Sequence, residues 1–201
     1  MARPPAIETE TALWLALNIR SLDLTDDQFY RFCRDNPDYR FEISAERELI
    51  IMSPTGFNTG RRNTKITQRL AEWAEKDGTG ECADSSTMFT LPNGAKRSPD
   101  GAWILKSRLS RFTEKEKDGF TTISPDFVVE LRSKSDRLSK LKRKMEEYMA
   151  NGVKLGWLLD PLDNCVYIYQ PGGSHERIDK PSVIKGDPVL PGFRFDFREI
   201  L

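Results

Sequence analysis

Two carboxylates stand in segments of the chain that are otherwise apolar. Glu130 lies within Phe127–Leu131, whose other residues are apolar and predict a central strand buried on both faces. Burying a carboxylate costs several kcal/mol unless it is protonated, paired or bound to a cation. Asp100 is its natural companion, because it follows Pro99 and leads into the apolar run Ala102–Leu105. Both acids therefore need a compensating partner.

Paired carboxylates of this kind can hold a metal. Two carboxylates that converge from adjacent strands form a site for Mg²⁺ or Mn²⁺, which prefer oxygen ligands and usually keep several waters. The metal polarises a phosphoryl group, lowers the pKa of its water and offsets developing charge, which is the minimal equipment for hydrolysing a phosphodiester. On the spacing of Asp100 and Glu130 alone, a buried ion pair or a strand-end carboxylate is the commoner arrangement.

A cation near the acids would complete such a site by stabilising charge on phosphorus. Arg132 stands two residues after Glu130, which predicts the same face of the strand. Lys144 is a second candidate: the strand advances about 10 Å from Glu130 to Ser133, and a helix folding back from Arg137 to Lys144 recovers about 10 Å. A solvated face of a lysine-rich helix is the alternative interpretation of Lys144.

Arg132 and two further basic pairs could contact DNA phosphates; the pairs are Arg61 with Arg62, and Lys140 with Arg143. Base rates favour solvated helix faces for such charge runs. The 31 Lys+Arg are matched by 31 Asp+Glu, so the whole chain lacks the charge of a strong non-specific DNA binder.

The elements that must position these residues follow from hydrophobic periodicity and from turn and cap signals. The predicted helices cover Asp26–Asp35 behind an N-cap at Thr25, Asn58–Lys76, Arg108–Lys117, and Leu138 to the terminating Asn151–Gly152 pair. The predicted strands cover Tyr39–Ile43, Glu48–Met52, Glu81–Ala83, Thr87–Leu91, Arg97–Leu105, Phe127–Leu131, Lys154–Leu159, Cys165–Tyr169 and a short run near Phe193–Phe197. This order predicts an α/β fold with a mixed central β-sheet flanked by helices.

Composition bounds the class of protein. The chain has 201 residues, 38% hydrophobic and 31% charged, which suits one globular domain over residues 1–201 with a poorly defined N-terminal arm over 1–24. No run approaches the roughly 20 apolar residues of a membrane span and no signal peptide is visible, so we expect a cytoplasmic protein with no membrane partner. Cys33, Cys82 and Cys165 are read as reduced thiols, and the single histidine, His175, has no nucleophile elbow beside it.

The motifs together resemble a known family. The strings that carry the resemblance are Arg97–Asp100, Pro125–Ser133, Lys144 with Tyr148, Gly152–Pro161, Glu42 within Tyr39–Ile43, and Met52–Gly56. In consistent order from about Asp26 to Pro161, they are similar to the Uma-two family of restriction endonucleases, within the PD-(D/E)xK nuclease superfamily. The resemblance implies a restriction endonuclease-like fold and a Mg²⁺-dependent phosphodiesterase site.

By that resemblance Asp100 and Glu130 are metal ligands, and Glu42 is an accessory acid. The superfamily signature places a lysine two residues after the second acid, where this chain has Arg132. A guanidinium stays protonated and cannot take a proton from water. The family uses a lysine from the next helix instead, which here is Lys144.

The leading hypothesis is a DNA endonuclease in which Asp100 and Glu130 bind Mg²⁺ or Mn²⁺ and Lys144 assists. One alternative is a catalytically inactive module that keeps the fold for DNA binding or regulation. Another is a structural scaffold whose acids are ion-paired with Arg132. Because PD-(D/E)xK nucleases often dimerise to cut both strands, the resemblance also allows a homodimer.

Overall fold

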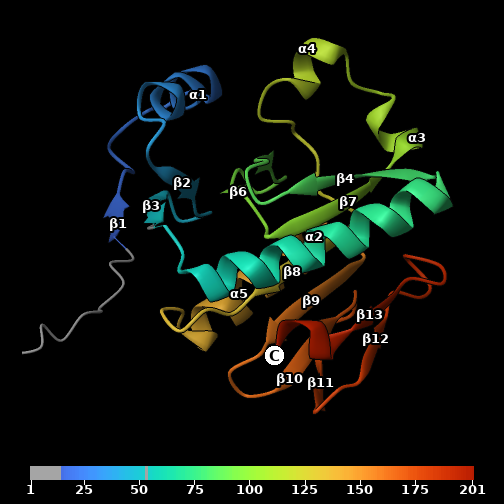
Figure 1. Ribbon diagram of the computed structural model, residues 1–201. Helices are drawn as coiled ribbons and strands as arrows, with labels where there is room; N and C mark the ends of the chain where they lie inside the picture. The colour runs from blue at the N-terminus through green and yellow to red at the C-terminus, as the bar shows by residue number, and fades with distance from the viewer. Residues whose placement is uncertain (1–14, 53) are drawn as a thin grey trace, which may run out of the picture.

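The computed structural model describes residues 15–52 and 54–201 (Figure 1). A five-stranded antiparallel sheet has the order β1 (Leu15–Asn18), β3 (Glu48–Met52), β2 (Arg40–Ile43), β6 (Lys96–Arg97) and β5 (Phe89–Thr90). Helix α1 (Asp26–Asp35) covers one face of it, with Phe29 buried in the same cluster as Phe41. As expected, Thr25 caps α1, in a capping box with Gln28.

The second sheet has six strands of mixed direction. Its order is β11 (Glu176–Asp179), β10 (Cys165–Tyr169), β9 (Leu155–Asp160), β8 (Phe127–Leu131), β7 (Gly101–Leu105) and β4 (Gly80–Asp84). Strands β8 and β9 are parallel, with Glu130 opposite Leu158, and the other pairs are antiparallel. The predicted mixed α/β sheet flanked by helices is confirmed.

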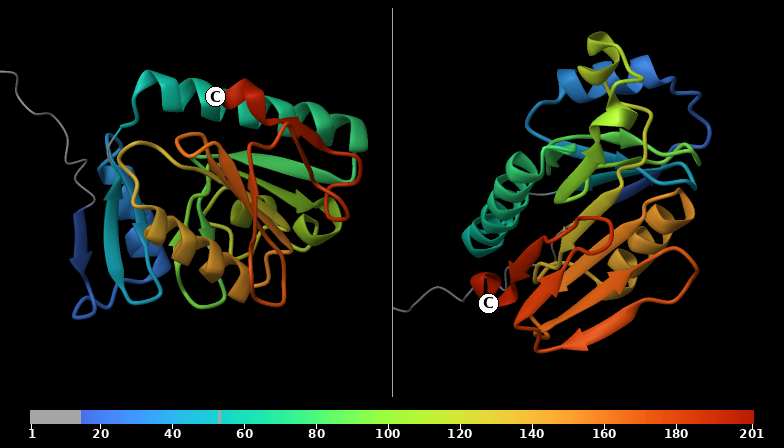
Figure 2. Two further views of the ribbon diagram at one scale, coloured as in Figure 1. Left: turned by 90° about the horizontal axis from the view of Figure 1, so that it is seen from below. Right: turned by 90° about the vertical axis from the view of Figure 1, so that its right-hand side faces the viewer.

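Helices lie on both faces of the six-stranded sheet (Figures 1 and 2). Alternation along β8 sends Val129 towards α2 (Phe57–Asp77), with Leu70, and Val128 towards α5 (Leu138–Ala150), with Met145. The C-terminal segment covers the α2 side with β12 (Val183–Lys185), β13 (Arg194–Asp196) and the 3₁₀ turn η1 (Phe197–Ile200). Glu130 therefore points to the α5 side.

Two predicted elements are divided. The strand expected over Arg97–Leu105 is wrong as one piece: β6 ends at Arg97 in the first sheet and β7 begins at Gly101 in the second. Pro99 lacks the N–H that a continuous strand would use in its ladder. The helix expected over Arg108–Lys117 is instead α3 (Lys106–Leu109) and α4 (Glu114–Lys117), because Thr113 is extended and caps a new helix.

Part of the expected N-terminal arm is ordered. Within residues 1–24, Leu15–Asn18 forms β1 and pairs with β3, while residues 1–14 lie outside the described part of the chain, as does Ser53 of the Met52–Gly56 string. Over residues 15–52 and 54–201, no helix has the length and apolar character needed to cross a bilayer.

Candidate active site

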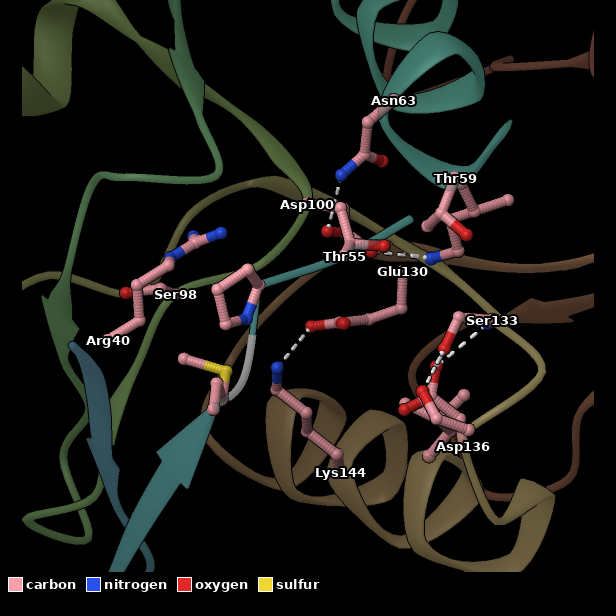
Figure 3. Close-up of a pocket in the computed structure, with 15 residues that line it drawn as sticks. Arg40, Thr55, Thr59, Asn63, Ser98, Asp100, Glu130, Ser133, Asp136 and Lys144 are labelled. Atoms are coloured by element: carbon pink, nitrogen blue, oxygen red, sulfur yellow. Dashed lines mark hydrogen bonds and ion pairs between the residues drawn. The ribbon is translucent and has the colours of Figure 1, made fainter. Parts of the chain in front are cut away.

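The two sheets meet where the chain crosses between them at Ser98–Asp100. An open cavity of ≈ 150 Å³ lies at this junction, beside α2 and α5 (Figure 3). Asp100, Glu130 and Lys144 line the cavity, and Glu42 lies directly behind Lys144 in β2. Residues from four elements or connections thus meet at one point, as the sequence motifs predicted for these four side chains.

Glu130 is buried and held from the α5 side. Its Oε1 accepts from Lys144 Nζ at 2.7 Å and from the Tyr148 hydroxyl at 3.1 Å, while no described residue donates to its other oxygen. Burial raises the pKa of Glu130 to about 8; Lys144 opposes the rise, and the charges of Asp100 and Glu42 add to it. A nearby positive charge would therefore stabilise the ionised form of Glu130 strongly.

Asp100 is partly exposed to the cavity, and each of its oxygens accepts one hydrogen bond. Asn63 Nδ2 on α2 donates to Oδ1 at 2.8 Å, and the backbone N–H of Leu131 donates to Oδ2 at 2.8 Å. Because Leu131 follows Glu130 in the chain, the second bond places the two acids side by side. Burial raises the pKa of Asp100, and these two hydrogen bonds oppose the rise.

Helix α5 folds back along the sheet and brings Lys144 to Glu130, as the distance estimate from the sequence predicted. The ammonium lies 2.7 Å from Glu130 Oε1 and 2.9 Å from Glu42 Oε1. Burial alone would lower the pKa of Lys144, but the charges of Glu130 and Glu42 outweigh it and raise that pKa. Lys144 is therefore protonated at neutral pH, and its ammonium can stabilise nearby negative charge and donate hydrogen bonds.

Glu42 is fully buried and both of its oxygens are occupied. Oε1 also accepts from the Ser98 N–H at 2.9 Å, and Oε2 accepts from Arg97 Nη1 at 3.0 Å. Burial alone would raise the pKa of Glu42, but Lys144 and Arg97 outweigh it and lower that pKa. Glu42 thus fits the task of anchoring Lys144 better than that of binding a metal.

Sequence reasoning gave no role to three residues of the cluster. Arg97 extends it by donating from Nε to Glu147 at 2.6 Å. Tyr148 and Asn63 hold Glu130 and Asp100 respectively. A signal existed for Tyr148, which stands four residues after Lys144 and so shares its helix face. None existed for Asn63, whose contact depends on how α2 packs.

Arg132 does not reach the cluster. Its guanidinium donates to Asp160 at 2.6 Å and to Asp163 at 2.9 Å. Strand β8 ends at Leu131, so the alternation that would put Arg132 on the face of Glu130 stops one residue too early. The scaffold hypothesis, in which the acids pair with Arg132, is wrong.

The other basic candidates occupy two places. On α2, Arg61 donates to the backbone carbonyls of Glu199 and Leu201, both at 3.3 Å, and Arg62 follows it. On α5, Lys140 and Arg143 line a separate groove of ≈ 510 Å³ between α5 and the five-stranded sheet. Contact of these four residues and of Arg132 with DNA stays a prediction.

The donor atoms at the cavity suit a hard divalent cation. Asp100 and Glu130 supply carboxylate oxygens, and Asn63 Oδ1 is a buried acceptor with no hydrogen-bond partner in the described chain. Residues 15–52 and 54–201 hold no group of three or more His, Cys, Asp or Glu side chains that could bind a metal. Two carboxylates completed by waters are the usual protein site for Mg²⁺.

Charge also favours a divalent cation here. The ionisable groups of the cluster are Glu42, Asp100, Glu130, Glu147, Lys144 and Arg97. When all are ionised, four negative charges face two positive ones; Arg40 and Asp136, which also line the cavity, add one charge of each sign, so the excess is two negative charges. One Mg²⁺ or Mn²⁺ would neutralise that excess.

Comparison with known proteins gives a family and a fold. A family model described as "Uma2: Putative restriction endonuclease" matches residues 26–198. The solved structure of a "putative nuclease belonging to DUF820" from Anabaena variabilis ATCC 29413 matches with a TM-score of 0.72 and 18% identity, over 88% of this chain and 97% of that one. A DrdV–DNA complex matches with a TM-score of 0.38 and 16% identity, over 60% of this chain and 10% of that one. No curated protein matches.

Proposed function

The chain belongs to the Uma2 family, and we propose that it is a divalent-cation-dependent nuclease that hydrolyses phosphodiester bonds in DNA. The observation that carries the proposal is the buried contact of Lys144 with Glu130 beside Asp100, at the edge of an open cavity. A buried ammonium next to paired carboxylates is expensive to maintain for stability alone. It is the equipment that phosphoryl transfer in water requires.

Asp100 and Glu130 are the residues that would hold Mg²⁺ or Mn²⁺. When bound, the cation would polarise the phosphoryl group and offset its developing charge. The hydrogen bonds from Asn63 and Leu131 keep the Asp100 carboxylate in a fixed orientation for that task.

Lys144 supplies the second positive charge. Its raised pKa keeps it protonated, so it acts as a hydrogen-bond donor that orients the attacking water and stabilises the negative charge on phosphorus, and not as a base. Glu42 positions Lys144 through the contact at 2.9 Å, and Arg97 in turn holds Glu42. The arrangement is preorganised before substrate arrives.

The test is a nicking assay on supercoiled plasmid with Mg²⁺ or Mn²⁺. We expect the wild type to nick, and Asp100→Asn and Glu130→Gln to lose activity while staying folded in urea melts, because the amides are near isosteres. Glu81→Gln removes an exposed carboxylate on β4 and should keep full activity, as the matched control. Full activity in both site variants would refute the proposal. Binding of Mn²⁺ and DNA by the wild type without any nicking would favour the non-catalytic module.

A further inference from the structure

Arg40 lies at the mouth of the same cavity. It is the first residue of β2 and pairs with Met52 of β3. Because alternate residues of a strand share a face, Arg40 projects on the side of Glu42, while Phe41 faces the core beneath α1. Its exposed side chain lines the cavity together with Asp100 and Glu130 (Figure 3).

The guanidinium of Arg40 has no hydrogen bond or ion pair with any residue of the described chain. The neighbouring arginines differ: Arg97 is held by Glu42 and Glu147, and Arg132 by Asp160 and Asp163. The Arg40 guanidinium therefore lies at the cavity without a hydrogen-bonded or ion-paired partner among residues 15–52 and 54–201.

The remaining polar groups at the cavity indicate what Arg40 would bind. Thr55, which precedes α2, Thr59 in its first turn, and Ser98 are hydroxyl-bearing residues that also line the cavity. A guanidinium fork matches the non-bridging oxygens of a phosphate, and hydroxyls donate to the same oxygens.

We propose that Arg40 binds a phosphate of the DNA strand that is cut, and holds that strand between β2 and the start of α2. The assignment rests on the proposed nuclease function and deepens it, since it names the residue that recognises the polynucleotide backbone. Arg40 takes no part in bond breaking. Its removal acts on substrate binding, and so on KM more than on kcat.

The experiment compares wild type, Arg40→Gln, Arg40→Lys and Arg34→Gln. Fluorescence anisotropy with a labelled DNA duplex is measured in EDTA, which prevents cleavage, across a range of NaCl concentrations. Arg34 is an exposed arginine of α1 whose guanidinium lies 5.9 Å from the Tyr30 ring, so its variant makes the same charge change away from the cavity. Urea melts and Mn²⁺ titrations of each variant check the fold and the metal site.

We expect Arg40→Gln to weaken DNA binding about tenfold and to reduce the slope of log Kd against log[NaCl] by about one. Arg40→Lys should keep the slope and lose part of the affinity, because an ammonium cannot bind a phosphate bidentately. Arg34→Gln should match the wild type, and Mn²⁺ affinity should not fall in any variant. Equal losses in Arg40→Gln and Arg34→Gln, or none in either, would overturn the assignment while leaving the proposed function intact. A wild type that neither binds nor nicks DNA would overturn both.

Discussion

Replacing Lys144 with methionine removes the cation that two buried acids share. In the metal-free protein, Glu130 at 2.7 Å and Glu42 at 2.9 Å would both lose it. Breaking a buried pair by removing one partner costs about 3–5 kcal/mol. The raised pKa of Glu130 lets that group take a proton, and Glu42 keeps Arg97 and the Ser98 N–H, so we expect the low end, about 3 kcal/mol.

The same change should lower the cleavage rate about 100-fold or more, as expected for loss of a positioned electrostatic group. Urea unfolding in EDTA and single-turnover cleavage at saturating Mg²⁺ measure the two effects separately. Lys142→Met, on the same helix, removes an ammonium 4.1 Å from the Tyr167 ring and should cost less than about 1 kcal/mol with no loss of rate.

A double variant separates the structural and chemical roles. Adding Glu42→Gln to Lys144→Met removes one of the two negative charges that lost the ammonium, and Arg97 keeps its pair with Glu147, so the double variant should recover part of the stability while the rate stays low. The reasoning fails if Lys144→Met unfolds at the urea concentration of the wild type in EDTA and turns over at the wild-type rate. It also fails if Glu42→Gln restores cleavage, because Lys144 would then act only through the fold.

Two further predictions use the ion pairs and the raised pKa. Arg132→Met leaves the buried Asp160 without its cation, so urea melts should show a loss of about 3 kcal/mol with little change in the single-turnover rate; loss of turnover in a folded protein would return Arg132 to the catalytic site. Because the pKa of Glu130 is raised from 4.5 to about 8, its contribution to the stability of the metal-free protein is fully present below 4.5 and is lost as the pH rises through about 8. Mn²⁺ must displace that proton, so calorimetry should show proton release and an affinity that rises from about pH 6 to 8; a flat profile would mean that Glu130 is already ionised.

Local patterns in the sequence predicted the parts of the site that depend on one element. The apolar run around Glu130 marked a buried strand, and the rise per residue of strand and helix was enough to bring Lys144 back to it. The pairing of elements could not be read in the same way. Nothing in the sequence Arg97–Leu105 indicates that its two ends belong to different sheets. The break between β6 and β7 is what brings Asp100 next to the sheet that contains Glu42.

Side-chain partners far along the chain were also hidden. The i+2 spacing predicted that Arg132 shares the face of Glu130. The strand ends before Arg132, however, and its guanidinium pairs with Asp160 instead. Arg61 lies in a basic run that suggests a DNA-binding face, yet it donates to Leu201, 140 positions away. A run of basic residues indicates that a surface could bind an anion. Whether those side chains are already paired within the protein depends on tertiary packing, which the run does not reveal.

Because the chain crosses between the two sheets at Ser98–Asp100, the cluster can assemble only after strands of both sheets have been synthesised. Glu42 accepts from an N–H 56 positions later, and the lysine that it anchors comes from a helix made later still. A chain emerging from the ribosome with only its first sheet complete has Glu42 and Arg40 but neither Glu130 nor Lys144. Until α5 has been synthesised and packed, such a chain lacks the assembled cluster on which the proposed nuclease activity depends.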